Sequence, residues 1–254
     1  MIDTFLGLPK VFKDICVIYP PKVRDMVDER TKSIVNLLTF SHEELEDFFV
    51  DKVDNEGNPI KPPTPFEYIM VNSLYNKDFE KQVKNSFELF LHEPVTLHYN
   101  VMSIIVGDLE KEVERVKNDK NAKENLIENF RVINADNFFS FQNELRAAMG
   151  EAKIDPPNEK ENPKIKRMKA LARYRDRVKA KKGLGITFEE TLVSICCMGI
   201  GLTPLNIGEI SYAAAKRLVE KYQQKEKYQI DINSLLAGAD SKKIKPKYWM
   251  NKDN

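Results

Sequence analysis

The stretch VTLHYNVMSIIVGD (residues 95–108) decides the fold class, because it is the clearest strand-forming segment in a chain whose other patterns are helical. Val95 to Val106 is rich in β-branched and aromatic residues, and Gly107-Asp108 supplies a stop. A second short apolar segment, Ile15 to Tyr19, ends at two prolines. Two strands alone are marginally stable. We therefore expect a small sheet or hairpin packed on helices, in a protein that is mainly α with a small β element (α+β).

Helix-start signals surround these strands. Capping boxes at Ser41-His-Glu-Glu44 and Thr187-Phe-Glu-Glu190 predict helix starts. Thr64-Pro-Phe-Glu67 predicts another, with Thr64 as the cap and Pro65 at the first helical position. A further helix is predicted over about 78–91. Asp136 is predicted to cap another helix, which Gly150 closes.

Periodicity and caps predict three more helices. Apolar residues recur with a period near 3.6 from Val23 to Leu38, which indicates an amphipathic helix. Thr203-Pro204 is predicted to begin a long helix that continues through Tyr222. Asp231 is predicted to cap a last short helix that ends at Gly238.

Charge is unevenly distributed along the chain. Its 254 residues include 40 basic and 39 acidic side chains, yet residues 1–157 have a net charge of −9 and residues 158–254 a net charge of +10. A polar, proline-punctuated stretch lies between the two halves. The predicted organisation is an acidic α+β domain (1–150), a linker (151–163), a basic helix (164–183) and a helical C-terminal module (184–254).

The segment KIKRMKALARYRDRVKAKK (164–182) holds ten basic residues, opposed by Asp176 alone. Its basic residues repel one another, so a negatively charged partner would stabilise such a helix. Three partners are considered: the acidic N-terminal half of the same or another copy, a different acidic protein, and nucleic acid. Nucleic acid is the least favoured, because no recognition module accompanies the run and Tyr174 is its one aromatic residue. The predicted charged contact surface consists of Lys164, Lys166, Arg167, Arg173, Arg175 and Arg177.

Apolar anchors are predicted near the C-terminus. A tryptophan in a basic terminal segment is commonly either docked on the core or used as an interface anchor. The candidate anchors are Leu235, Leu236, Tyr248 and Trp249.

No motif indicates catalysis or metal binding. His92 and His98 flank Pro94, which forbids the helix that a HExxH zinc site requires. No cysteine has a context that would activate its thiol, and no Ser lies in a GxSxG motif. We therefore expect a non-enzymatic protein without a metal ion or cofactor.

The sequence also predicts a protein of the cytoplasm. The longest apolar stretch, 192–202, is about half of what a membrane-spanning helix needs. The start of the chain lacks the basic and long apolar regions of a secretory signal. Adjacent Cys196 and Cys197, with Cys16 far away, suggest no disulfide framework.

Two segments resemble proteins of known context. TFEETLVSICCMGIGLTPLNIGEISYAAAKRLVEKYQQKEKYQIDI (187–232), followed by LLAGADSKKIKPKYWM (235–250), resembles proteins encoded in the tail-morphogenesis gene blocks of tailed bacteriophages that infect low-GC bacteria. ENFRVINADNFFSFQNELRAAMG (128–150) resembles a stretch of the same proteins. Some of them are tail assembly chaperones. The resemblance covers roughly residues 125–250 and consists of spacings, with no catalytic signature.

The resemblance implies a function in assembly. Tail assembly chaperones bind the long, helical tape-measure protein in the host cytoplasm and help recruit tail-tube subunits. The alternative is a structural subunit of the virion, in the tail, baseplate or neck. A third hypothesis, of another class, is a nucleic-acid-associated adaptor that uses the basic helix. Segregated charge would also allow copies of the chain to self-associate.

Overall fold

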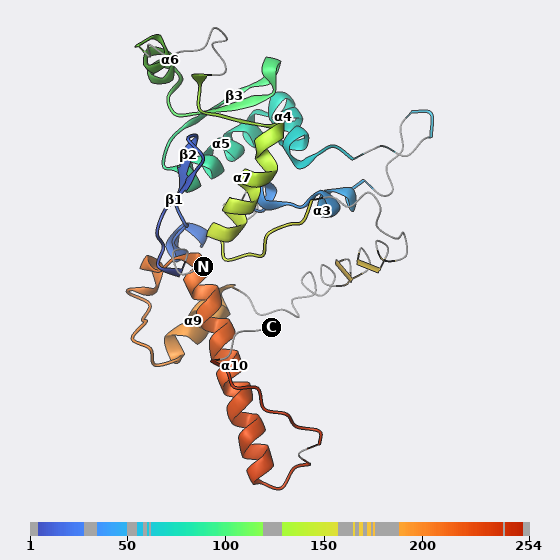
Figure 1. Cartoon of the computed structure of the whole chain (residues 1–254), viewed down its shortest axis with the longest axis vertical. Helices are drawn as coiled ribbons and strands as arrows, with labels where there is room; N and C mark the ends of the chain where they lie inside the picture. Colours follow the sequence, from blue (N-terminus) through green and yellow to red (C-terminus); the bar gives the residue numbers. More distant parts are fainter. Residues whose placement is uncertain are drawn as a thin grey trace.

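The protein is mainly α, with two small antiparallel sheets (Figure 1). This is the fold class that the sequence predicts. The computed structural model describes residues 5–27, 35–49, 55–57, 60, 62–118, 129–156, 165, 168–169, 172–173, 175, 188–240 and 242–250.

The larger sheet has three strands in the order β3-β4-β5, which are Val95–His98, Ser103–Val106 and Val132–Asn134. The prediction of one strand over 95–106 was wrong, because the segment is a hairpin. The chain reverses through a 3-10 turn, η2 (Tyr99–Val101), and through Met102, whose φ of 46° is left-handed. No glycine or proline marks this reversal, so the apolar run hides it.

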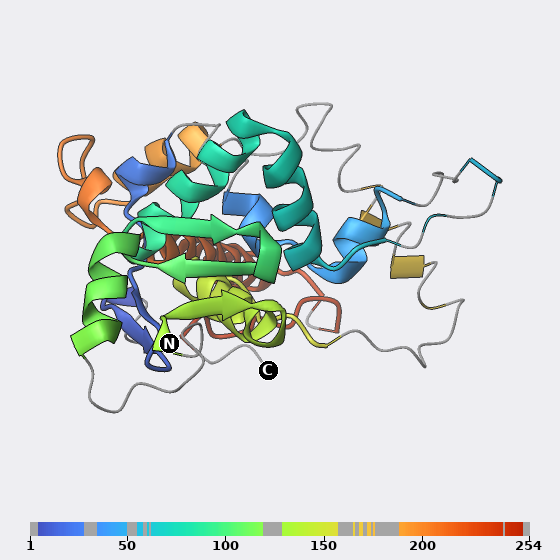
Figure 2. The same cartoon turned by 90° about the horizontal axis from the view of Figure 1, so that it is seen from above.

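The smaller sheet pairs β1 (Lys10–Phe12) with β2 (Cys16–Ile18). The predicted strand at 15–19 is confirmed as β2, whereas its partner β1 was not foreseen. Two helices, α5 (Lys77–Leu91) and α7 (Ala135–Ala148), contact strands of both sheets and lie between them (Figures 1 and 2).

Local capping explains where the helices of this body begin. Ser41 caps α3 (His42–Glu46) and Thr64 caps α4 (Pro65–Tyr75), as predicted. Both form capping boxes, of which the sequence predicts the one at Ser41. Asp136 is not a cap. The side chain of Asn134 accepts hydrogen bonds from the Asp136 and Asn137 amides and begins α7 two residues earlier.

The main core is built on aromatic rings between these helices and sheets. The Phe87 and Phe141 rings stack with centroids 5.6 Å apart, and Phe12 meets Phe141 edge-on at 5.5 Å. All three are buried. Aromatic pairs of this kind add to the free energy gained from burial alone.

The C-terminal region contains α9 (Phe188–Cys197), a 3-10 turn η4 (Ile207–Glu209) and the long helix α10 (Tyr212–Leu236). Thr203-Pro204 does not begin the long helix, because Ser211 caps it eight residues later. Asp231 caps no separate helix, since α10 runs through it without a break.

Two further helix predictions fall partly on residues outside the described ranges. Thr187, the predicted cap of α9, is one of these residues. Of the helix predicted from Val23 to Leu38, the structure shows a 3-10 turn η1 (Val23–Met26) and helical residues 35–39, and 28–34 lie outside the described residues.

Replacing Phe141 by Ala should lower the free energy of unfolding by about 3–5 kcal/mol, because the ring is fully buried and its loss leaves a cavity. Urea denaturation followed by circular dichroism measures the change. Tyr75→Ala on α4 is the control, since this side chain is 83% exposed and its loss should change stability by less than about 0.5 kcal/mol. Equal losses for the two variants would contradict the assigned core.

Candidate interaction surface

The base of α10 is fixed to an N-terminal segment, residues 21–24. The Tyr212 amide donates to the Pro21 carbonyl (2.8 Å), and the Val23 amide donates to the Ile210 carbonyl (3.0 Å). Glu209, just before the helix, pairs with Lys22 (2.8 Å) and with Arg24 (2.6 Å). These contacts join segments that are almost 190 residues apart in sequence.

A second hydrophobic cluster lies under this junction. It contains Val23, Ile195, Ile207 and Ala215, with Val219 packed against it. The end of α7 also meets α10 directly, because a Cβ added to Gly150 would lie 3.0 Å from the Ala213 Cα. Only glycine fits that approach, and its φ of 70° is also the left-handed conformation that glycine adopts readily.

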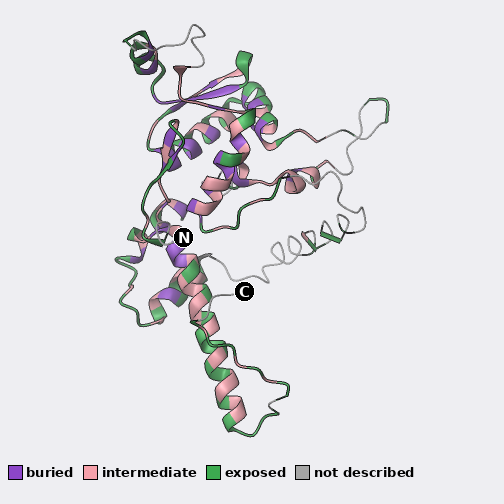
Figure 3. Cartoon of the chain, viewed as in Figure 1, coloured by how far each residue is buried: buried purple, intermediate pink, exposed green. Residues whose placement is uncertain are grey.

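Beyond Val219 the helix leaves the body. We call residues 220–236 of α10 the arm. All of them are described, and none of them is buried (Figure 3). At 1.5 Å per residue the arm is about 25 Å long. Figure 1 shows it extending away from both sheets, with the C-terminal chain beside it.

The arm has an apolar stripe along one side. Tyr228, Ile232, Leu235 and Leu236 are spaced at i, i+4, i+7 and i+8, the pattern of a helix face that packs against a partner. Leu236 is nevertheless 82% exposed. Ile230, which is 64% exposed, lies on the opposite side of the helix from the stripe. Apolar side chains this exposed at helical spacing mark a surface suited to binding another protein.

The C-terminal chain, residues 239–250, turns back along the arm, and we call it the tail. Gly238, with φ of 94°, makes the reversal. The Tyr248 ring meets the Tyr228 ring edge-on at 5.6 Å, and the Lys221 ammonium donates to the Trp249 carbonyl (3.3 Å). The four predicted anchors, Leu235, Leu236, Tyr248 and Trp249, therefore belong to one structural unit made of arm and tail.

The basic segment is described only in part. Lys164, Lys166, Arg167 and Arg177 lie outside the described residues. Arg175 is exposed. Arg173 binds α3: its guanidinium donates to both oxygens of Asp47 (2.9 and 3.2 Å) and to Glu43 (2.7 Å).

This contact joins one residue of the predicted basic surface, Arg173, to the acidic half of the same chain. The Asp47 side chain is only 8% exposed, so the pair is partly shielded from water. Hydrogen bonding to Asp47 raises the pKa of Arg173 above its usual value, and the nearby negative charge of Glu43 adds to the effect. A two-pronged arginine–carboxylate pair is the strong form of such contacts.

Arg173→Glu should release the chain at Arg173 from α3 and speed cleavage there by proteinase K roughly tenfold, because charge-assisted hydrogen bonds are lost. Mass spectrometry of the fragments gives the cleavage rate. Arg175→Glu, which changes the same charge at an exposed position, should leave it unaltered. Adding Asp47→Arg to Arg173→Glu should restore protection, and equal cleavage of all variants would contradict the contact.

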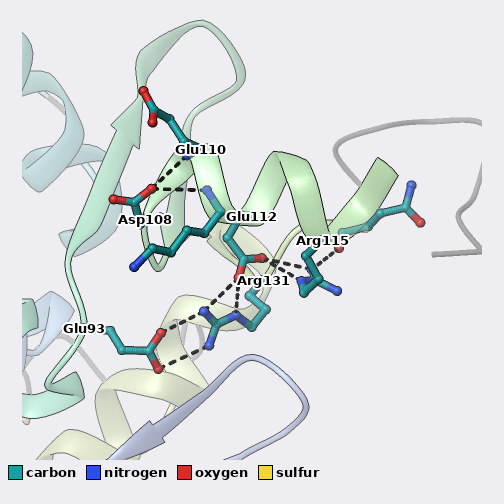
Figure 4. A network of polar contacts seen from close by, with 8 residues as sticks. Glu93, Asp108, Glu110, Glu112, Arg115 and Arg131 are labelled. Atoms are coloured by element: carbon teal, nitrogen blue, oxygen red, sulfur yellow. Dashed lines mark hydrogen bonds and ion pairs between the residues drawn. The ribbon is translucent and has the colours of Figure 1, made fainter. Parts of the chain in front are cut away.

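A second ionic cluster ties α6 (Leu109–Asn118) to the larger sheet (Figure 4). Arg131 binds Glu93 through two hydrogen bonds (2.7 and 3.2 Å) and Glu112 through two more (2.9 and 3.1 Å). Arg115 binds the other oxygen of Glu112. Gly107 leaves room for the Arg131 guanidinium, because a Cβ at position 107 would lie 2.5 Å from the Arg131 Nη2.

The role of this ionic cluster is structural. Glu112 is buried and every one of its carboxylate oxygens accepts from an arginine. The hydrogen bonds that Arg131 donates to Glu93 and Glu112 raise the pKa of its guanidinium, which stays charged. Salt-bridged groups that satisfy one another leave no side chain poised for proton transfer at this point.

Cys16 lies buried in the main core. Burial raises the pKa of the Cys16 thiol to about 12, which keeps it protonated. Among the side chains that the structure describes, no group of three His, Cys, Asp or Glu is placed to hold a metal ion. Within the same ranges, no helix has both the length and the apolar character needed to cross a membrane.

Sequence reasoning missed part of the surface. Ile232 belongs to it, as does Tyr228, against which the tail packs. Continuing the helical period through Asp231, in place of a new helix there, would have placed both with Leu235 and Leu236. For the basic segment, the sequence predicted an acidic partner only as the N-terminal half in general. It did not identify Asp47 and Glu43 as the residues that bind Arg173.

Comparison of the chain with protein-family models, with curated proteins and with solved structures finds no match.

Proposed function

We propose that the protein is a non-enzymatic assembly chaperone of bacteriophage tails, which binds helical segments of the tape-measure protein through the arm. The phage context comes from the resemblance of residues 125–250 to tail-morphogenesis proteins. The binding role comes from the surface itself.

The observation that carries the proposal is that the arm extends beyond the body of the protein and none of its residues is buried. A helix of this length is marginally stable in water without packing. None of its residues is buried, and Leu236 of its apolar stripe is 82% exposed, whereas the helices of the main body pack on a buried core. A protein whose partner is itself a long amphipathic helix would bury that stripe on binding.

Mass spectrometry of purified phage particles separates the two assembly roles. A chaperone acts during assembly and leaves, so the protein should be present in infected cells and absent from particles. Stoichiometric presence in the particle would contradict the chaperone role and favour the structural subunit.

Co-expression tests the partner. The long helical protein encoded next to this one should remain in the soluble fraction when both are produced together and should aggregate when produced alone. The control is co-expression with an unrelated soluble protein of similar size. Aggregation in the presence of this chain would contradict the proposed partner.

A further inference from the structure

We propose that the tail is an intramolecular strap on the apolar side of the arm, and that a partner reaches this side only when the tail is displaced. The inference rests on the proposed function in one respect, which is that the arm is the surface that a partner binds. It goes beyond that function because it assigns a role to the tail and makes binding by the arm conditional on the release of the tail.

Burial along the arm is uneven and follows one side of the helix. Five of its half-buried residues lie within about 60° of Tyr228 round the helix, namely Lys221, Gln224, Asp231, Ile232 and Leu235. Residues of the same types away from this side are exposed. Ile230, about 160° round the helix from Tyr228, is 64% exposed, and Leu236 is 82% exposed. The Tyr228 side of the arm is therefore covered, whereas the opposite side is not.

The tail makes contacts that account for this cover. The Tyr248 ring meets the Tyr228 ring edge-on at 5.6 Å. The Lys221 ammonium, two helical turns closer to the base of the arm, donates a hydrogen bond to the Trp249 carbonyl (3.3 Å). Figure 1 shows the tail returning from the end of α10 to the arm near its base.

Burial within the tail shows the same one-sidedness. The half-buried residues of the tail are Ile244, Pro246 and Trp249, whereas Lys243, Lys245 and Lys247 are exposed. Alternation between covered and exposed side chains is typical of an extended segment that lies with one side against a surface. The tail therefore presents its apolar residues to the arm and its lysines to water.

A hydrogen-bonded turn directs the tail back along the arm. Gly238 has a φ of 94°, and its amide donates to the Leu235 carbonyl (3.0 Å). Asp240 then accepts from the Lys242 amide through its side chain (2.9 Å) and from the Ile244 amide through its carbonyl (3.2 Å). Because this connection is short, the tail stays beside the arm at an effective concentration on the order of millimolar.

The cover is shallow, which allows it to be displaced. None of the arm and tail residues that the structure describes is buried, and Tyr248 is 48% exposed although it contacts Tyr228. A partner that buries the whole apolar stripe gains more contact than the tail provides. The attached tail nevertheless competes with every ligand of this side, and it lowers the apparent affinity by the fraction of chains in which the arm is open.

The single tryptophan of the chain reports directly on the strap, because Trp249 lies in the tail. Tyr228→Asp removes the ring that Tyr248 contacts, so acrylamide should quench Trp249 fluorescence about twofold more strongly as the half-buried indole becomes exposed. Ile230→Asp is the matched control, since it places the same charge on the uncovered side of the arm and should leave quenching unchanged. Circular dichroism should show equal helix content for the two variants.

A labelled synthetic peptide with the tail sequence, ADSKKIKPKYWM (239–250), tests competition for the covered side. In the full-length chain, Ile244→Ser with Tyr248→Ser and Trp249→Ser should detach the tail, and this detached-tail variant should bind the peptide. The wild-type chain should bind it at least about tenfold more weakly, because its own tail occupies the same side at high effective concentration. Fluorescence anisotropy measures both affinities.

Matched controls locate the peptide on the arm. A peptide with the same three serine substitutions keeps the charge of the tail and should bind neither chain. Adding Tyr228→Asp to the detached-tail variant should abolish peptide binding, whereas adding Ile230→Asp should preserve it.

Three results would overturn the inference. The first is Trp249 quenching that Tyr228→Asp leaves unchanged, and the second is equal affinity of the peptide for the wild-type and detached-tail chains. The third is no binding to the detached-tail chain at peptide concentrations up to about 1 mM, because a tail that binds so weakly would be released most of the time even in the intact chain.

None of these measurements uses phage material. Failure of the strap therefore leaves the particle and co-expression tests of the proposed function unaffected. Failure of those two tests would in turn leave the quenching and peptide results to decide on the strap.

Discussion

Two backbone hydrogen bonds between residues 21–23 and 210–212 determine where the long helix leaves the body. They join the last part of the chain to a segment that is itself tied to the main core, because the Tyr19 amide donates to the Phe90 carbonyl at the end of α5 (2.7 Å). The direction of α10 is therefore set by contacts at its first turn. Everything beyond Val219 projects as a consequence of this junction.

The arm differs from the rest of the chain in how it is stabilised. Helices α5 and α7 derive their stability from burial between two sheets, as most helices in proteins do. The arm has only its own backbone hydrogen bonds, a few side-chain contacts and the tail. Such a helix has a low local free energy of opening, which is typical of segments that bind partners.

The sequence predicts those parts of the fold that depend on neighbouring residues. The predicted caps at Ser41 and Thr64 are confirmed, because each needs only side chains a few residues apart. The hairpin turn at Met102 and the late start of α10 at Ser211 depend on tertiary contacts, here the pairing of β4 with β5 and the bridge between Ser211 and Lys22. Local patterns carry no record of such contacts.

The candidate site was predictable to a similar extent. The anchors Leu235, Leu236, Tyr248 and Trp249 stood out because apolar residues in a basic terminal segment are conspicuous, and the structure places them on the arm and tail. The carboxylates that bind Arg173 were not predictable as individual residues. Asp47 is 126 positions from Arg173 in the sequence, and from the sequence alone many other carboxylates in the acidic half were equally good candidates.

Hydrogen exchange of the isolated protein tests most directly whether the arm is unsupported. Amides in 213–219 of α10, which pack on the second cluster, should be protected, whereas those in 221–236 should exchange at least about a hundredfold faster, because local opening there costs little. Mass spectrometry of peptic fragments resolves the two regions. Uniform protection along α10 would mean that the arm has the same local free energy of opening as the base of the helix. That result would contradict the conclusion that the arm lacks packing partners within the chain that would stabilise it.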